Sequence, residues 1–220
     1  MPIFRLLKDS ILLPKIVVVI DVFRSSNTII EMLTCGAKMV IPTAEVSDAI
    51  ALKKKNHRWL AFGERQGIKI DGFDGDNSPT QVDRQVLDRT IVLTTSGGTR
   101  AINACKNEKI VYFGSFANAK ALIRRLRVSH KGDDIGFWAV GVEGNKIALE
   151  DELCAQYLNA LWKDEVVNFD NYRDDLLSCP GAVRLHNLKQ NKDLDYCTTV
   201  DSRDVVPILN WRKGLPCIEK

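Results

Sequence analysis

Acidic side chains follow several short β-branched runs of this 220-residue sequence, at the point where each run ends. Asp21 comes directly after the apolar run 15–20, and Glu64 follows the run 59–62. A carboxylate at the end of a buried strand must be paired or must bind something. Carboxylate oxygens suit a hard cation, most plausibly Mg²⁺. We therefore expect Mg²⁺ ligands and a general base to come from one set of residues: Asp21, Glu64, Asp74, Glu150 and Asp151.

Donors suited to an anion occupy other strand ends. Ser96-Gly97-Gly98-Thr99 follows the run 91–93, and a glycine turn there lets backbone N–H groups approach an anion. Arginine engages phosphoryl oxygens in bidentate fashion. The expected anion-binding residues are Arg24, Ser25, Ser96, Gly97, Gly98, Thr99, Arg100, Ser115 and Asn118. An anion cradle beside a magnesium site is typical of phosphoryl transfer.

Each of these features also has a purely structural explanation. Acidic residues such as Glu150 and Asp151 are favoured in the first turn of a helix by the macrodipole. Glycines after a strand, such as Gly97 and Gly98, are common in tight turns. The segment 71–79, which contains Asp74, is also typical of a surface loop.

The elements that must position these residues alternate along the chain. The predicted strands are 15–20, 37–41, 59–62, 91–93, 110–113 and 135–140, and the predicted helices follow Ser25-Ser26 and cover 46–55, 117–127 and 149–162, with another after the turn at Gly97-Gly98. This alternation predicts an α/β fold, a three-layer α/β/α arrangement with a largely parallel or mixed sheet built from βαβ units. We interpret residues 1–220 as a single domain. If the strands are parallel, their carboxyl ends bring the polar clusters to one edge of the sheet.

Composition excludes several classes of protein. The 31 Lys+Arg and 28 Asp+Glu residues give a net charge of +3, and 45% of residues are hydrophobic, which excludes a disordered chain. So small a charge predicts no nucleic-acid partner. No apolar run approaches about 18 residues, which predicts no membrane partner. The six cysteines form no C-x-x-C pair, and Arg5, Lys8 and Asp9 leave no signal-peptide core in the N-terminal segment, so we expect a reduced, cytoplasmic protein. A homo-oligomer is left open.

Several named chemistries lack their motif. The sequence has no P-loop, no G-x-G-x-x-G and no G-x-S-x-G. Phe23 stands where an aspartyl-phosphate phosphatase would have the second aspartate of D-x-D. Cys197 and Arg203 have the spacing of a cysteine phosphatase loop, but that loop would contain Asp201, which repels anions, and no glycine. The three histidines share no metal-binding spacing, which disfavours a zinc site.

Six motifs, in order over about residues 16–160, resemble those of the 2-phosphosulfolactate phosphatases. They are Asp21–Thr28, Gly63–Gly67, Gly72–Pro79, Thr94–Ala101, Gly114-Ser115 with Asn118, and Ala148–Cys154. A weaker similarity continues at Asp195-Tyr196-Cys197 and Asp201–Val206.

The resemblance implies a Mg²⁺-dependent hydrolase that releases phosphate from 2-phosphosulfolactate to leave 3-sulfolactate, a step toward coenzyme M. In this hypothesis Asp21, Glu64, Asp74 and Arg24 are catalytic, and Arg65 meets the carboxylate or sulfonate of a small anionic substrate. Two alternatives stay open. One is a phosphatase of another phosphorylated hydroxy acid, and the other is a non-catalytic binding module for a phosphorylated or sulfonated acid.

Overall fold

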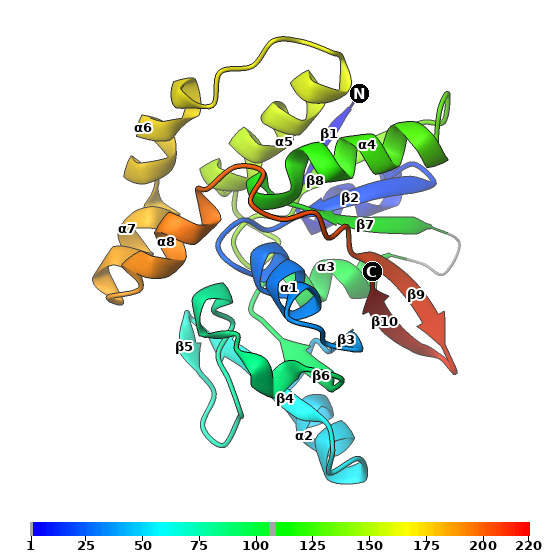
Figure 1. The fold of residues 1–220 in the computed structure, drawn as a ribbon, viewed down its shortest axis with the longest axis vertical. Coiled ribbons are helices and arrows are strands. Elements are labelled where there is room, and N and C mark those ends of the chain that lie inside the picture. Colours follow the sequence, from blue (N-terminus) through cyan, green and yellow to red (C-terminus); the bar gives the residue numbers. More distant parts are fainter. Residues whose placement is uncertain (1, 106–108) are drawn as a thin grey trace.

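The computed structural model describes residues 2–105 and 109–220, with their side chains except those of Arg100 and Asn103. Within this part of the chain, one sheet of ten strands is accompanied by eight α-helices (Figure 1). The strands are β1 (Ile3–Arg5), β2 (Ile16–Ile20), β3 (Met39–Pro42), β4 (Leu60–Arg65), β5 (Ile68–Lys69), β6 (Thr90–Thr94), β7 (Ile110–Gly114), β8 (Ile135–Ala139), β9 (Ile208–Arg212) and β10 (Leu215–Glu219). The helices are α1 (Ser25–Thr34), α2 (Val46–Lys55), α3 (Gly98–Ala104), α4 (Ala119–Ser129), α5 (Leu149–Trp162), α6 (Asp170–Ser178), α7 (Pro180–Asn187) and α8 (Asn191–Cys197). Short 3-10 turns are η1 (Leu7–Leu12), η2 (Pro79–Gln81), η3 (Arg84–Val86) and η4 (Phe116–Asn118).

The sheet is mixed and consists of two parallel blocks joined by a hairpin. The strand order is β1-β8-β2-β7-β9-β10-β3-β6-β4-β5. Strands β1, β8, β2 and β7 are parallel to one another, and so are β3, β6 and β4. The hairpin β9–β10 pairs antiparallel with β7 on one side and with β3 on the other. The α/β class and the mixed sheet agree with the prediction from sequence.

The sheet wraps around two helices, and this brings the strand ends together. Three successive antiparallel pairings, β7–β9, β9–β10 and β10–β3, make the two blocks run in opposite directions along the sheet. The carboxyl ends of the strands still meet at one place, but the reason differs from the one expected from sequence, which was that the strands are parallel. Instead, α1 and α3 lie between the two blocks, with the hairpin closing one side (Figure 1). Residues from both blocks and both helices share one core cluster.

Strand β2 shows why the middle of the sheet is apolar on both faces. All five of its residues are buried. Val17 and Val19 belong to the inner core around α1 and α3, whereas Ile16, Val18 and Ile20 belong to the outer core beneath α4 and α5. Continuous apolar runs are typical of strands covered on both faces.

Further helices cover the outer faces of the sheet and complete the three layers. α4 and α5 cover the block that contains β2, and α2 packs on the outside of β4 and β6 through Ala49, Ala61 and Val92. The C-terminal helices α6, α7 and α8 continue the outer core beyond α5 and contribute Leu176, Leu185 and Cys197. Helix α7 therefore lies beside the carboxyl ends of the strands, where Arg184 and Leu185 line a cavity.

The bounds of α2 and α5 match the predicted helices 46–55 and 149–162. The sequence did not predict β1, β5, the hairpin β9–β10 or helices α6 to α8. These strands and helices are short, and most of the helical residues are exposed, so their apolar patterns are weak. The turn of the hairpin uses Lys213 and Gly214, which both have positive φ, as a two-residue hairpin turn requires.

All six cysteines are free thiols. Across residues 2–105 and 109–220, no helix combines the length and the apolar character that a membrane crossing would need.

Candidate active site

A cavity of about 250 Å³ lies where the carboxyl ends of β2, β4, β6 and β8 approach the N-termini of α5 and α7. Its lining is rich in charged side chains. The residues that line it are Asp21, Phe23, Arg24, Glu64, Gln66, Gly67, Asn77, Thr95, Ser96, Gly97, Gly141, Val142, Glu143, Ala148, Glu150, Asp151, Arg184 and Leu185. Asp21, Glu64 and the adjacent pair Glu150 and Asp151 come from three distant parts of the sequence and thus surround one space.

Asp21 lies between the end of β2 and the start of α1. Its Oδ1 accepts a hydrogen bond from the backbone N–H of Ser25 at 3.3 Å. Burial, together with repulsion from Glu64 and Glu150, raises the pKa of Asp21 from 3.8 to about 6. A carboxyl group with such a pKa can exchange a proton near neutral pH.

The glycine turn before α3 packs directly against Asp21. A Cβ on Gly98 would lie 2.4 Å from Ser25 Oγ and 2.8 Å from Asp21 Oδ2, so only glycine fits there. A Cβ on Gly97 would meet nothing closer than 3.4 Å. Gly97 lines the cavity, whereas Gly98 supports Asp21 and Ser25 from outside the lining.

Glu150 and Asp151 enter the site from the first turn of α5. Asp151 Oδ1 accepts a hydrogen bond from Val22 N at 2.8 Å, and Oδ2 accepts one from Gly141 N at 2.9 Å, so this carboxylate links the ends of β2 and β8. Burial, with repulsion from Asp21 and Glu150, raises the pKa of Asp151 well above its usual range. Burial also raises the pKa of Glu150, which accepts a hydrogen bond from the Cys179 thiol at 3.4 Å.

Glu64, near the end of β4, holds the loop that follows β6. Its Oε1 accepts a hydrogen bond from Ser96 N at 2.7 Å. Its Oε2 accepts bonds from Gly67 N at 2.7 Å and from Ser96 Oγ at 3.1 Å. With this many bonds to its carboxylate, Glu64 fixes the positions of the Ser96 loop and of the Gly67 turn at the cavity wall.

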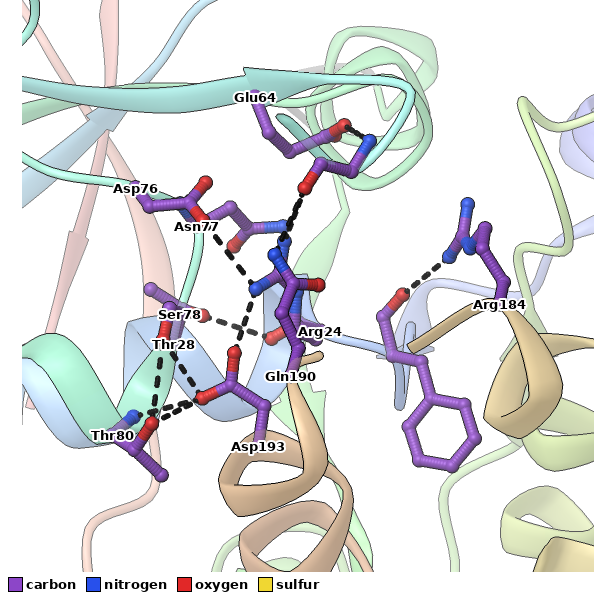
Figure 2. Close-up of polar contacts among 12 residues, drawn as sticks. Arg24, Thr28, Glu64, Asp76, Asn77, Ser78, Thr80, Arg184, Gln190 and Asp193 are labelled. Atoms are coloured by element: carbon purple, nitrogen blue, oxygen red, sulfur yellow. Dashed lines mark hydrogen bonds and ion pairs between the residues drawn. The ribbon is translucent and has the colours of Figure 1, made fainter. Parts of the chain in front are cut away.

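Arg24 belongs to a buried ionic network (Figure 2). Its Nη1 donates to Asp193 Oδ2 at 2.6 Å and lies 3.5 Å from Asp76 Oδ2. The other oxygen of Asp193 accepts bonds from Ser78 Oγ at 2.7 Å and from Thr80 Oγ1 at 2.5 Å. Arg24 thus contributes to the cavity wall, but two carboxylates already balance its charge.

Two predicted site residues lie away from the cavity. Asp74 Oδ2 accepts hydrogen bonds from Lys53 Nζ at 2.6 Å and from Ala61 N at 2.7 Å, and Asp74 does not line the cavity. Arg65 donates to Glu64 O, Ala44 O and Thr94 Oγ1 at 2.8 to 2.9 Å and is also absent from the lining. The loop of Asp74 and the guanidinium of Arg65 instead brace the end of β4.

Four other predicted anion-binding residues are absent from the cavity lining and bond within the protein. Ser25 donates its N–H to Asp21, as described above. Thr99 exchanges backbone and hydroxyl hydrogen bonds with Thr95. Ser115 N donates to Asn118 Oδ1 at 3.0 Å, while Asn118 Nδ2 donates to Val205 O at 3.0 Å. The prediction for Arg100 concerns a side chain outside the described part of the structure, although its backbone belongs to α3.

Sequence reasoning missed several residues of the site. Arg184 of α7 lines the cavity, and Asp193 of α8 holds Arg24, and both come from the segment after residue 165, which showed no regular pattern. No local signal marks either residue, because each gains its place only through packing of α7 and α8 beside α1. Asn77 lies in the aspartate- and glycine-rich segment that the sequence did single out.

The carboxylate oxygens around the cavity are of the type that binds a hard cation. Burial raises the pKa values of three carboxylates that line the cavity, those of Asp21, Glu150 and Asp151, and repulsion from neighbouring carboxylates adds to the rise for Asp21 and Asp151. In the described part of the chain, no three His, Cys, Asp or Glu side chains are arranged to hold a metal ion by themselves. Mg²⁺ in phosphoryl-transfer sites usually takes one or two carboxylates, and waters and substrate oxygens complete its coordination. The residues present therefore fit such an ion.

The fold and the cavity together define a class of protein: an α/β protein in which carboxylates and two arginines surround one small cavity. A family model described as 2-phosphosulpholactate phosphatase matches residues 3–211. The chain belongs to the 2-phosphosulpholactate phosphatase family, which confirms the resemblance seen in the six motifs.

Similar proteins carry the same description. A probable 2-phosphosulfolactate phosphatase of Caldicellulosiruptor saccharolyticus is 38% identical over 178 residues, covering 79% of this chain and 72% of the relative. One from Caldanaerobacter subterraneus subsp. tengcongensis is 34% identical, covering 94% of this chain and 92% of the relative. Another, from Clostridium novyi, is 30% identical over 94% of each chain. The similarity thus includes the C-terminal helices as well as the central sheet.

Proposed function

We propose that this protein hydrolyses the phosphate ester of 2-phosphosulfolactate to 3-sulfolactate and phosphate, with Mg²⁺ as cofactor, in the cytoplasm and as a step toward coenzyme M. The observation that carries the proposal is that Asp21, Glu64, Glu150 and Asp151 surround one small cavity together with Arg24 and Arg184. Membership of the family and the names of the relatives support the choice of substrate.

Oxygens of Asp21, Glu150 and Asp151 would hold the Mg²⁺, because these three carboxylates share the most crowded part of the site. A bound Mg²⁺ supplies charge that stabilises the phosphoryl oxygens as the ester bond breaks. The backbone N–H of Gly97 would orient the phosphoryl group. Glu64 accepts hydrogen bonds from Ser96 N and Oγ, which fixes the loop that carries Gly97.

Asp21 is the residue that would handle the proton or attack the phosphorus. Before Mg²⁺ binds, burial raises its pKa to about 6, so the carboxyl group can hold or release a proton near neutral pH. The Asp21 carboxylate could attack the phosphorus itself and form a phospho-intermediate, or it could take a proton from an attacking water. Its place at the end of β2 allows either step.

Phosphate release tests the proposal. The purified protein is incubated with 2-phosphosulfolactate in Mg²⁺ and, separately, in EDTA, and with a panel of other phosphorylated hydroxy acids. We expect release in Mg²⁺, none in EDTA and the highest kcat/KM for 2-phosphosulfolactate. A higher kcat/KM for another acid would reassign the substrate. Binding of the acids without any release would favour the non-catalytic binding module.

A further inference from the structure

Arg184 is the arginine of the cavity that forms no salt bridge with a described carboxylate, although its charge favours the ionised forms of Asp21 and Glu150. Its Nη2 donates one hydrogen bond, to Phe23 O at 3.3 Å. Its Nε is buried and has no partner among the described residues, and none of the described acidic side chains forms a salt bridge with it. Figure 2 shows Arg184 apart from the network around Arg24 and Asp193, with its single bond to the Phe23 carbonyl.

The two arginines of the cavity are therefore not equivalent. Arg24 is 2% exposed and lies between Asp193 and Asp76, so its charge is balanced inside the protein. Arg184 keeps unused N–H groups at the cavity, and a buried donor without a partner costs free energy until something accepts its hydrogen bond. The planar guanidinium is well suited to an oxyanion with two oxygens on one side.

Packing of α7 fixes where Arg184 stands. A Cβ on Gly181 would lie 2.2 Å from Glu150 Oε1 and 2.9 Å from Phe23 Cδ2, so the first turn of α7 is pressed against both residues. Arg184 follows three residues later, on the same face of the helix. Its position beside the Phe23 carbonyl is thus set by backbone packing and not by an ion pair.

Groups other than Arg184 can bind the phosphoryl group of the substrate. The proposed Mg²⁺ ligands and the glycine turn at Gly97 come from β2, α5 and the end of β6, whereas Arg184 comes from α7. A substrate such as 2-phosphosulfolactate carries acidic groups beyond the phosphate, and these need a cationic partner of their own. The sequence suggested Arg65 for this role. Its guanidinium instead donates hydrogen bonds to Glu64 O, Ala44 O and Thr94 Oγ1.

We propose that Arg184 binds the second oxyanion of the substrate, its carboxylate or sulfonate, and so selects phosphate esters of acids. The proposal rests on the function proposed above and names the residue that recognises the part of the substrate that does not react. Arg184 is a specificity residue in this scheme.

Binding of two probes tests the proposal without depending on catalysis. Isothermal titration in Mg²⁺ measures 3-sulfolactate, which has a carboxylate and a sulfonate but no phosphate, and inorganic phosphate. In the Arg184→Met variant we expect 3-sulfolactate to bind about 10- to 100-fold more weakly, as for loss of a charge-assisted hydrogen bond, while phosphate binding is unchanged. Arg184→Lys should fall between, because lysine keeps the charge and lacks the fork.

A matched control and the fold are checked in the same experiment. Arg173→Met removes an exposed arginine of the neighbouring helix α6 and should bind both probes as the wild type does. Thermal unfolding and circular dichroism show that each variant is folded. Equal weakening of both probes in Arg184→Met, no weakening, or a wild type that does not bind 3-sulfolactate would each overturn the proposal. If binding of 3-sulfolactate depends on Arg184 but no ester is hydrolysed, the assignment of Arg184 stands and the proposed function fails.

Discussion

The fold holds the Asp21 carboxylate where its negative charge is unfavourable, because it is partly desolvated and close to other carboxylates. It is half-buried near Glu64 and Glu150, and desolvation together with repulsion from both carboxylates raises its pKa. A cluster of buried acids that serves only stability would be selected against, because each negative charge disfavours its neighbours. Crowding of this kind is a common property of functional sites.

The variant Asp21→Asn separates function from stability. We expect Mg²⁺-dependent phosphate release to fall at least about a hundredfold, as for other removed catalytic groups. The folded state should survive, because asparagine keeps the shape and removes the repulsion. An exposed aspartate after α5, replaced in Asp164→Asn, is the control and should leave phosphate release as it is. Full activity of Asp21→Asn would remove Asp21 from the mechanism.

The pH dependence of stability gives a second readout of the same variant. The folded protein binds the proton of Asp21 more tightly than the unfolded chain does, since its pKa is raised from 3.8 to about 6. Its contribution to stability is therefore present below pH 3.8 and is lost as the pH rises to about 6. In EDTA, urea unfolding should show Asp21→Asn gaining stability relative to the wild type across this range. A constant difference at all pH values would contradict the raised pKa.

Among the elements, α3 and α7 begin with glycines that touch the carboxylates of the site. Gly98 lies against Asp21 and Ser25, and Gly181 lies against Glu150 and Phe23. Neither glycine is required by its own backbone angles, since neither has a positive φ. Each is required because a helix must approach a functional side chain more closely than a Cβ allows.

Two neighbouring substitutions test this requirement. Gly98→Ala places a methyl group 2.4 Å from Ser25 Oγ and 2.8 Å from Asp21 Oδ2, so α3 or Asp21 must move. We expect a loss of about 1–3 kcal/mol in the free energy of unfolding and a large loss of phosphate release. Gly97→Ala has room, with its nearest atom at 3.4 Å, and should be nearly neutral for stability. Urea unfolding and phosphate release measure both, and equal behaviour of the two variants would contradict the close packing at Gly98.

For the whole molecule, the decisive feature is the hairpin β9–β10, which joins the two parallel blocks. Ile218 of β10 pairs with Val40 of β3 and with Leu209 of β9, and all three side chains belong to the core around α1 and α3. Without this connection the two halves of the cavity would belong to separate sheets. The last residues of the chain therefore hold together carboxylates that come from its first three quarters.

Truncation of Ile218 measures this contribution. Ile218→Ala should lower the free energy of unfolding by about 2–5 kcal/mol, the usual cost of emptying a packed core position. Val166→Ala, at a fully exposed position before α6, should change it by less than about 0.5 kcal/mol. Denaturant unfolding of both variants makes the comparison. Similar small changes would show that the hairpin does not hold the blocks together.

Local sequence patterns determined the elements that carry the reactive residues and much of the chemistry. The run 15–20 is apolar because both faces of β2 are covered, and α5 has its predicted bounds because its period of apolar residues is strong. Asp21, Glu64, Ser96, Gly97, Glu150 and Asp151 were all chosen from sequence and all line the cavity. These residues could be found because each lies at the end of an element that has a clear local pattern.

Tertiary structure alone decided which of the other polar residues reach the site. Asp74 and Arg65 lie in the expected motifs, yet backbone groups and Lys53 take up their hydrogen-bonding atoms. Arg184 and Asp193 come from short helices without a clear pattern. Through the packing of α7 and α8, Arg184 lines the cavity and Asp193 binds Arg24 behind the cavity wall. Periodicity records which face of a segment is buried, whereas contacts between segments more than a hundred residues apart depend on how the sheet wraps, which no local pattern encodes.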